Sequence, residues 1–195
     1  MNIITNNCVG ARCYEILKQQ FQNPFMWSIV LPADFRYLIE NFNKIRFNNV
    51  TTFKEYFEPR ETETYGLLLD NKIKVFFIHH KFDETAATPT KKGSDLYYNK
   101  IEEYLVHEWL KRLSRMNNEQ PHFLGVANGL WKDTDIYKFI QLNTEYKKSL
   151  IVYDKRFTQY STAASKIIAM PKSGISTYRV AQIFIDQCKQ DNYTL

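Results

Sequence analysis

The chain has 195 residues, which is enough for one domain with a full hydrophobic core and too short for two of ordinary size. Hydrophobic residues make up 44% and aromatic residues 15%, with six Gly and six Pro, which excludes the disordered and fibrous classes. The net charge of +5 comes from 26 basic and 21 acidic residues mixed along the chain, so no basic tail indicates nucleic-acid binding.

The three cysteines, Cys8, Cys13 and Cys188, lack the paired spacing of a disulfide framework or a zinc site. They predict free thiols in a reducing compartment and no metal. The N-terminus lacks the basic region and apolar core of a signal peptide, and no window approaches eighteen uncharged apolar residues. We therefore expect a cytoplasmic protein without stable membrane insertion.

The first predicted elements are a buried strand over residues 1–5 and a helix over 11–20, joined by the turn Asn6-Asn7-Cys8-Val9-Gly10. A continuous apolar run at 25–31 predicts a strand that is covered on both faces. The three- and four-residue spacing of apolar side chains over 33–42 predicts an amphipathic helix. The strand, turn and helix at the start form one unit on which the rest of the interpretation depends.

The middle of the chain is less regular. Residues 47–56 show no clear period. Two apolar runs, 64–70 and 73–80, are separated by a polar turn and predict a β-hairpin. The small and turn-forming residues over 81–93 predict a mobile loop.

The second half of the chain alternates helices and strands. The predicted elements are a helix over 96–116, a strand over 122–127, a helix over 133–142, strands over 149–153 and 166–170, and a helix over 175–189. Because parallel neighbours need a crossover and a helix is the usual one, this order predicts a mainly parallel sheet flanked by helices. We expect a single α/β domain over residues 1–195.

The turn after the first strand is the first candidate site, because ligands collect at the carboxyl ends of parallel strands and a helix N-terminus offers free N–H groups. Cys8 is a candidate nucleophile there, or alternatively a small buried side chain at a strand end. Asn6, Asn7 and Gly10 are the candidate substrate-binding residues of the same turn. Cys13, on the following helix, is expected to face the sheet.

His79 and His80 end the predicted hairpin, and one of them is the candidate base that a thiol nucleophile needs. Because side chains alternate along a strand, only one ring of the pair can face a given site. The alternative is a histidine at a strand edge without any chemistry.

Arg112 and Arg115 lie on adjacent turns of the long predicted helix, where guanidinium groups can bind phosphate or carboxylate. A solvated basic helix end, stabilised by the helix dipole, explains the same residues equally well. The chain has no Gly-rich phosphate loop and no G-x-S-x-G elbow, so no pattern identifies a cofactor.

Three separated motifs resemble those of an uncharacterised family of bacterial exopolysaccharide or capsule biosynthesis proteins, and the resemblance covers roughly residues 1–155. The first motif is Ile4-Thr5-Asn6-Asn7-Cys8-Val9-Gly10 followed by Asn23-Pro24-Phe25 and Pro32-Ala33-Asp34-Phe35. The second is the strand pair from Tyr65-Gly66 to His79-His80, and the third is Trp109-x-x-Arg112-x-x-Arg115-Met116-Asn117. The chain departs from the family pattern at Val9, Asn23 and His80, where Trp, Ser and an aromatic residue are usual.

The resemblance implies an enzyme that transfers an acyl or glycosyl group to or from a sugar or an activated sugar. In this hypothesis Cys8 is the nucleophile or a contact on the oxyanion side, and His79 or His80 is the base. Arg112 and Arg115 bind the phosphate or carboxylate of a substrate, and Trp109 joins them in the substrate-binding set.

A second resemblance concerns Gly10-Ala11-Arg12-Cys13 with Asn23-Pro24-Phe25-Met26-Trp27, which is similar to elements of bacterial papain-like cysteine peptidases. There Cys13 is the matching thiol, although Met26 replaces the usual Asp. It implies a cysteine hydrolase that uses Cys13 and a histidine. A third hypothesis is a non-catalytic protein that binds a sugar or a nucleotide.

Overall fold

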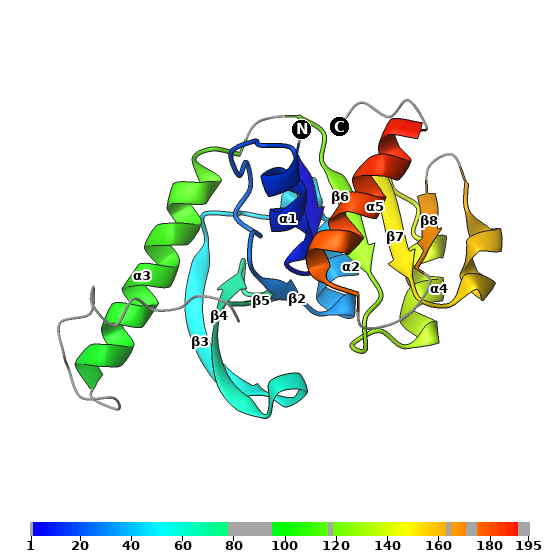
Figure 1. Ribbon diagram of the computed structural model, residues 1–195. Coiled ribbons are helices and arrows are strands. Elements are labelled where there is room, and N and C mark those ends of the chain that lie inside the picture. Colours follow the sequence, from blue (N-terminus) through cyan, green and yellow to red (C-terminus); the bar gives the residue numbers. More distant parts are fainter. Residues whose placement is uncertain (1, 78–94, 117–118, 163–164, 171–174, 191–195) are drawn as a thin grey trace.

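The computed structural model describes residues 2–77, 95–116, 119–162, 165–170 and 175–190 (Figure 1). The loop predicted over 81–93 lies outside these residues. Within them, the chain forms two four-stranded sheets. The elements are β1 (Ile3–Thr5), α1 (Val9–Ile16), β2 (Ile29–Val30), α2 (Pro32–Glu40), η1 (Phe42–Lys44), β3 (Val50–Phe57), η2 (Glu58–Arg60), β4 (Thr62–Leu69), β5 (Ile73–Phe76), α3 (Asp95–Leu113), β6 (His122–Val126), α4 (Asp133–Gln141), β7 (Lys147–Val152), η3 (Lys155–Tyr160), β8 (Ser165–Ala169) and α5 (Thr177–Gln190).

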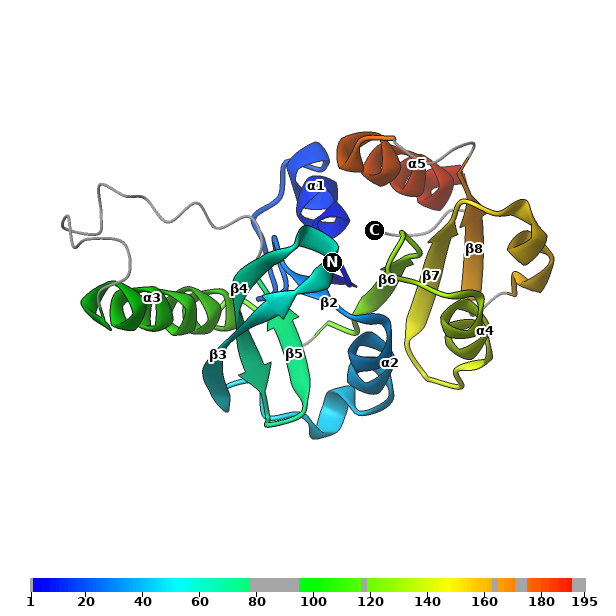
Figure 2. The same ribbon diagram turned by 90° about the horizontal axis from the view of Figure 1, so that it is seen from below.

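The first sheet is parallel and has the strand order β1-β6-β7-β8. Helices α1 and α5 pack against each other on one face, and α2 and α4 cover the opposite face (Figure 2). All five residues of β6 are buried, as are the last five of β7. Burial on both faces explains why the central strands are continuous apolar runs in the sequence.

The second sheet is antiparallel, with the strand order β2-β5-β4-β3, and α3 packs against β3 and β4. The predicted hairpin is confirmed as β4 and β5. Its turn holds Asp70 and Asn71 at φ values of 49° and 56°, the type I′ geometry that matches the twist of paired strands. The sequence pattern does not predict β3, because that strand carries no regular apolar period.

The strand predicted over 25–31 is wrong in length. Only β2 at its end is a strand, and it pairs antiparallel with β5. Residues 25–28, which precede β2, form turns instead of a strand. Asn23 Oδ1 accepts a hydrogen bond from Phe25 N (3.1 Å), and Ser28 Oγ donates one to Phe25 O (2.7 Å). Side-chain hydrogen bonds of this kind compete with strand pairing.

One hydrophobic core joins the two sheets. It includes Phe123 and Leu150 from the parallel sheet, Leu67 from the antiparallel sheet and Trp109 from α3. A second apolar cluster lies under α1 and α5. The predicted fold class, α/β with a parallel sheet flanked by helices, is confirmed, and the antiparallel sheet is an addition that the order of elements did not indicate.

Candidate functional site

The turn between β1 and α1 lies at the carboxyl edge of the parallel sheet, which is the lower edge in Figure 1. Asn6 follows β1 and is 1% exposed. Its Oδ1 accepts a hydrogen bond from Val126 N (2.8 Å), its Nδ2 donates to Val126 O (3.3 Å), and its main-chain oxygen accepts from Val30 N (3.0 Å). Asn6 therefore continues the pairing of β1 with β6 and links the parallel sheet to β2.

The rest of the turn is closed by its own polar groups. Thr5 Oγ1 donates a hydrogen bond to Asn7 O and accepts one from Gly10 N (3.3 Å), and Asn7 Oδ1 accepts one from Val9 N (3.0 Å). A Cβ on Gly10 would stand 2.7 Å from Thr5 Oγ1, so only glycine fits without a shift of Thr5. Asn6, Asn7 and Gly10, the predicted substrate contacts, thus shape the turn itself.

Cys8 is the N-cap residue of α1 and is 5% exposed. Its carbonyl accepts a hydrogen bond from Arg12 N (3.4 Å), the first bond of the helix. The N-terminal end of a helix stabilises negative charge through its free N–H groups and dipole. Cys8 is the cysteine that lies at such an end.

Cys13 and Cys188 lie in the interior between α1 and α5, at 0% and 3% exposed. Burial is the main cause that raises the pKa of both thiols, that of Cys188 to about 11 and that of Cys13 further. A protonated, inaccessible thiol is a poor nucleophile. This position gives Cys13, the alternative nucleophile, the surroundings of a core side chain.

The first and third motifs of the resemblance, which are far apart in the sequence, meet around residues 23–28. Phe25 packs edge-on against Trp109 of α3, with ring centroids 5.2 Å apart. One turn further along α3, Arg112 Nη1 donates a hydrogen bond to Met26 O (2.8 Å). Asn23 Nδ2 donates to Ile3 O (2.8 Å) at β1. The Asn-Pro-Phe stretch is therefore the part that connects the first strand to α3.

Trp109 and Arg112 hold this arrangement together. Trp109 is 1% exposed, and its Nε1 donates to Phe47 O (2.8 Å). Arg112 is 7% exposed, and burial lowers the pKa of its guanidinium, opposed by the charge of Glu108. Arg112, one of the two predicted anion-binding arginines, therefore has its guanidinium engaged within the protein. Arg115 differs, because its Nε is buried without a hydrogen-bond partner among the described residues.

Trp27 has a φ of 62°, a left-handed conformation that bulky side chains rarely adopt. The bond from Arg112 fixes the Met26 carbonyl directly before it. The Arg12 Cζ lies 4.7 Å from the centre of the Trp27 ring, and Arg12 Nη1 pairs with Glu15 (2.6 Å). Backbone strain that neighbours hold in place is typical of functional sites. The sequence analysis did not name Arg12 or Trp27 as site residues. The position of Arg12, one helical turn after the candidate nucleophile Cys8, could have indicated Arg12.

Residues 1–101 match the family model described as Domain of unknown function (DUF1919). The chain belongs to this family. No curated protein matches the chain. The DUF1919 match covers Cys8 and Trp27, whereas Trp109, Arg112 and the strands β6 to β8 lie beyond it. The matched part thus supplies the turn, and the remainder supplies most of the sheet against which the turn packs.

The general base of the hypothesis, His79 or His80, stays a prediction for this DUF1919 chain. His79 and His80 lie outside the described residues. His122 is 7% exposed, and its Nε2 lies 2.9 Å from Ser149 Oγ. Burial lowers the pKa of His122 to about 4, so the ring is neutral at pH 7.

Two negative findings concern the described part of the chain alone. It contains no group of three His, Cys, Asp or Glu side chains that could hold a metal ion. No helix in it is long and apolar enough to cross a membrane.

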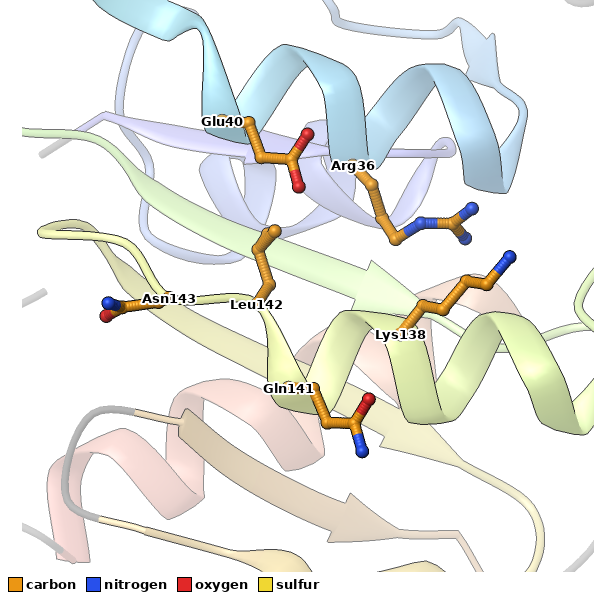
Figure 3. A pocket seen from close by; sticks show the side chains of 6 residues that line it. All are labelled: Arg36, Glu40, Lys138, Gln141, Leu142 and Asn143. Atoms are coloured by element: carbon orange, nitrogen blue, oxygen red, sulfur yellow. The ribbon is translucent and has the colours of Figure 1, made fainter.

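Two adjoining hollows lie at the opposite, amino edge of the parallel sheet, where α2 and α4 end. The first has a volume of about 390 Å³ and is lined by Arg36, Glu40, Lys138, Gln141, Leu142 and Asn143 (Figure 3). The second, of about 310 Å³, shares Glu40 and Asn143 and continues along residues 39–44 and 143–146. We call the two together the α2–α4 groove. Neither hollow is lined by a thiol or an imidazole, so the groove suits binding rather than nucleophilic chemistry.

Proposed function

We propose that this DUF1919 protein is a cytoplasmic group transferase of exopolysaccharide or capsule biosynthesis that acts on a sugar or an activated sugar. The observation that carries the proposal is the position of Cys8 at the N-cap of α1, one helical turn from the Arg12 guanidinium on the strained Trp27. A nucleophile, a cation and an aromatic ring are held there by helices and strands. The motif resemblance supplies the substrate class.

In the acyl-transfer form of this function, Cys8 Sγ as thiolate attacks the carbonyl carbon of an activated acyl donor. The bond from that carbon to the donor's leaving group breaks, and a thioester forms on Cys8. A sugar hydroxyl then gives its proton to His79 or His80 and attacks the thioester, which releases Cys8 as thiolate. The positive end of α1 stabilises the thiolate in both steps.

The arginines divide into two roles. Arg12 and Arg115 offer guanidinium groups to a phosphate or carboxylate of the donor or acceptor. Arg112 is a positioning residue, because its hydrogen bond to Met26 O (2.8 Å) fixes the peptide before Trp27. Cys8 is 5% exposed, so neighbouring side chains must move before a substrate reaches the thiol.

The test is the alkylation rate of each cysteine with iodoacetamide as a function of pH, in the folded full chain, with peptide mass spectrometry as the readout. We expect Cys8, at the N-cap of α1, to react near neutral pH, whereas Cys13 and Cys188, whose pKa values are raised by burial, serve as controls and react only after denaturation. In cells, Cys8→Ser should abolish polysaccharide assembly and Cys188→Ser should not.

Other outcomes identify other functions. Reaction at Cys13 in place of Cys8 would indicate the cysteine hydrolase. Three inert thiols, together with normal polysaccharide from the Cys8→Ser variant, would overturn the transferase and leave a non-catalytic sugar- or nucleotide-binding protein.

A further inference from the structure

The α2–α4 groove has the chemical make-up of a site for an uncharged, hydroxyl-rich ligand. Its lining carries three cations, Arg36, Lys138 and Lys44, and two anions, Glu40 and Glu145. Arg36 Nη1 also pairs at 2.8 Å with Asp135 Oδ1, which lies outside the lining, so the groove has little net charge with which to select a phosphate or a polycation.

The C-terminal end of α2 also disfavours an anion, because the negative end of its dipole lies beside the groove. The negative end of α4 lies there too, but a lysine offsets it. The carbonyls of Phe139 and Ile140 in α4 accept hydrogen bonds from Lys148 Nζ at 2.7 and 3.0 Å, and Leu142 O accepts a third. Lys148 is 4% exposed and is engaged with these carbonyls, so it is not a cation that a ligand in the groove could contact.

The remaining lining is rich in groups that donate and accept hydrogen bonds at once. Gln141, Asn143, Asn43 and Thr144 provide amides and a hydroxyl, which match the mixed donor and acceptor character of vicinal hydroxyl groups. Leu142 and the ring of Tyr146 add small apolar surfaces suited to the C–H faces of a sugar ring.

Several of the polar groups are already held in position. Arg36 is fixed by its ion pair with Asp135, and Asn43 Nδ2 donates to Glu145 Oε1 (3.1 Å). Figure 3 shows Arg36 and Lys138 side by side on the facing helices, with Glu40 pointing into the space between α2 and α4. Groups held on rigid helices lose little entropy when they bind a ligand.

We infer that the α2–α4 groove binds a neutral oligosaccharide of hexose units. The inference rests on the proposed function for its substrate class, and it describes a glycan-binding surface that is separate from the place where a sugar hydroxyl would meet Cys8. The two adjoining hollows, of about 390 and 310 Å³, suit a chain of units rather than a single small molecule.

The test is titration of the purified full chain with neutral gluco-, galacto- and manno-oligosaccharides of two to six units. Binding is measured by isothermal titration calorimetry and by changes in the NMR chemical shifts of the backbone amides. We expect saturable binding of at least one of them and roughly tenfold weaker binding for Glu40→Ala and for Gln141→Ala. Thr134→Ala, an exposed α4 change outside the groove, is the matched control and should bind normally. Thermal melting confirms that the variants fold.

The inference is overturned if no oligosaccharide binds at millimolar concentration, if the groove variants bind as tightly as the original chain, or if inorganic phosphate or UDP displaces the sugar. Binding requires no turnover, so its failure leaves the Cys8 alkylation result untouched. Conversely, three inert thiols would refute the transferase while sugar binding in the groove persisted.

Discussion

At the carboxyl edge of the parallel sheet, polar side chains are hydrogen-bonded to the main chain. The Asn6 amide bonds to both the N–H and the carbonyl of Val126, and Thr5 Oγ1 accepts a hydrogen bond from Gly10 N within the β1–α1 turn. At the amino edge, α2 and α4 diverge and leave a polar groove whose side chains are mostly exposed. The comparison shows that one edge is committed to stability and precise positioning of Cys8, while the other has polar groups left for a ligand. Substitutions at the two edges should therefore separate folding from binding.

The largest effect is expected from Asn6→Ala. The change removes both hydrogen bonds to Val126 and leaves its buried N–H without a partner. We expect a loss of about 3 to 4 kcal/mol in the free energy of unfolding, measured by urea denaturation. Asn43→Ala at the amino edge is the matched amide control and should change stability by less than about 0.5 kcal/mol. Equal effects of the two substitutions would refute the contrast between the edges.

The next effect concerns the pH dependence of His122. The folded pKa of about 4 lies below the ordinary 6.5 because the ring is buried, so the unfolded chain binds a proton that the folded chain does not. The stability from the neutral ring is complete above pH 6.5 and is lost as the pH falls toward 4, by about 3 kcal/mol. In His122→Gln, the free energy of unfolding should decrease less between pH 6.5 and pH 4 than it does in the original chain. If its dependence on pH is the same in both proteins, the lowered pKa of His122 is contradicted.

A smaller loss is expected from Gly10→Ala at the carboxyl edge. The added Cβ would stand 2.7 Å from Thr5 Oγ1 and 2.8 Å from Thr5 Cγ2, which forces the hydrogen-bonded Thr5 side chain to move. We expect about 2 kcal/mol of destabilisation. Gly129→Ala is the control, since its Cβ would meet nothing within 4 Å. Comparable melting temperatures for both variants would show that the turn has room to relax.

The smallest effect is expected from Arg36→Ala at the amino edge. Its ion pair with Asp135 is partly exposed, with side chains 15% and 21% accessible, and such pairs contribute about 1 kcal/mol or less. Urea denaturation in low and high salt should show a small loss that salt reduces further. If the free energy of unfolding decreased by more than about 2 kcal/mol, the groove would contribute to folding stability and the contrast between the two edges would be wrong.

The helices and the hairpin follow from local sequence. The spacing of Phe35, Leu38 and Ile39 fixes the buried face of α2, and Asp70-Asn71 fixes the turn between β4 and β5. These signals act between residues close in sequence, so a single chain shows them.

The candidate site is only partly predictable in the same way. The sequence indicated Cys8 at a helix N-terminus after the first strand, which the structure has at the N-cap of α1. It did not indicate that Arg112 would be buried against Met26 O, or that Arg12 would lie over Trp27. These contacts join α1, α3 and the segment between them, and no local pattern encodes the distance between such segments.

By itself, the sequence determined the α/β class, most of the helices and strands, and the β1–α1 turn, because hydrophobic periodicity and turn chemistry are local properties. Only the tertiary structure decided that the strands divide into two sheets, that residues 25–28 turn instead of pairing, and that α2 and α4 leave a groove. Those outcomes depend on long-range hydrogen bonds and packing, such as Asn6 with Val126 and Phe25 with Trp109, whose partners are about a hundred residues apart.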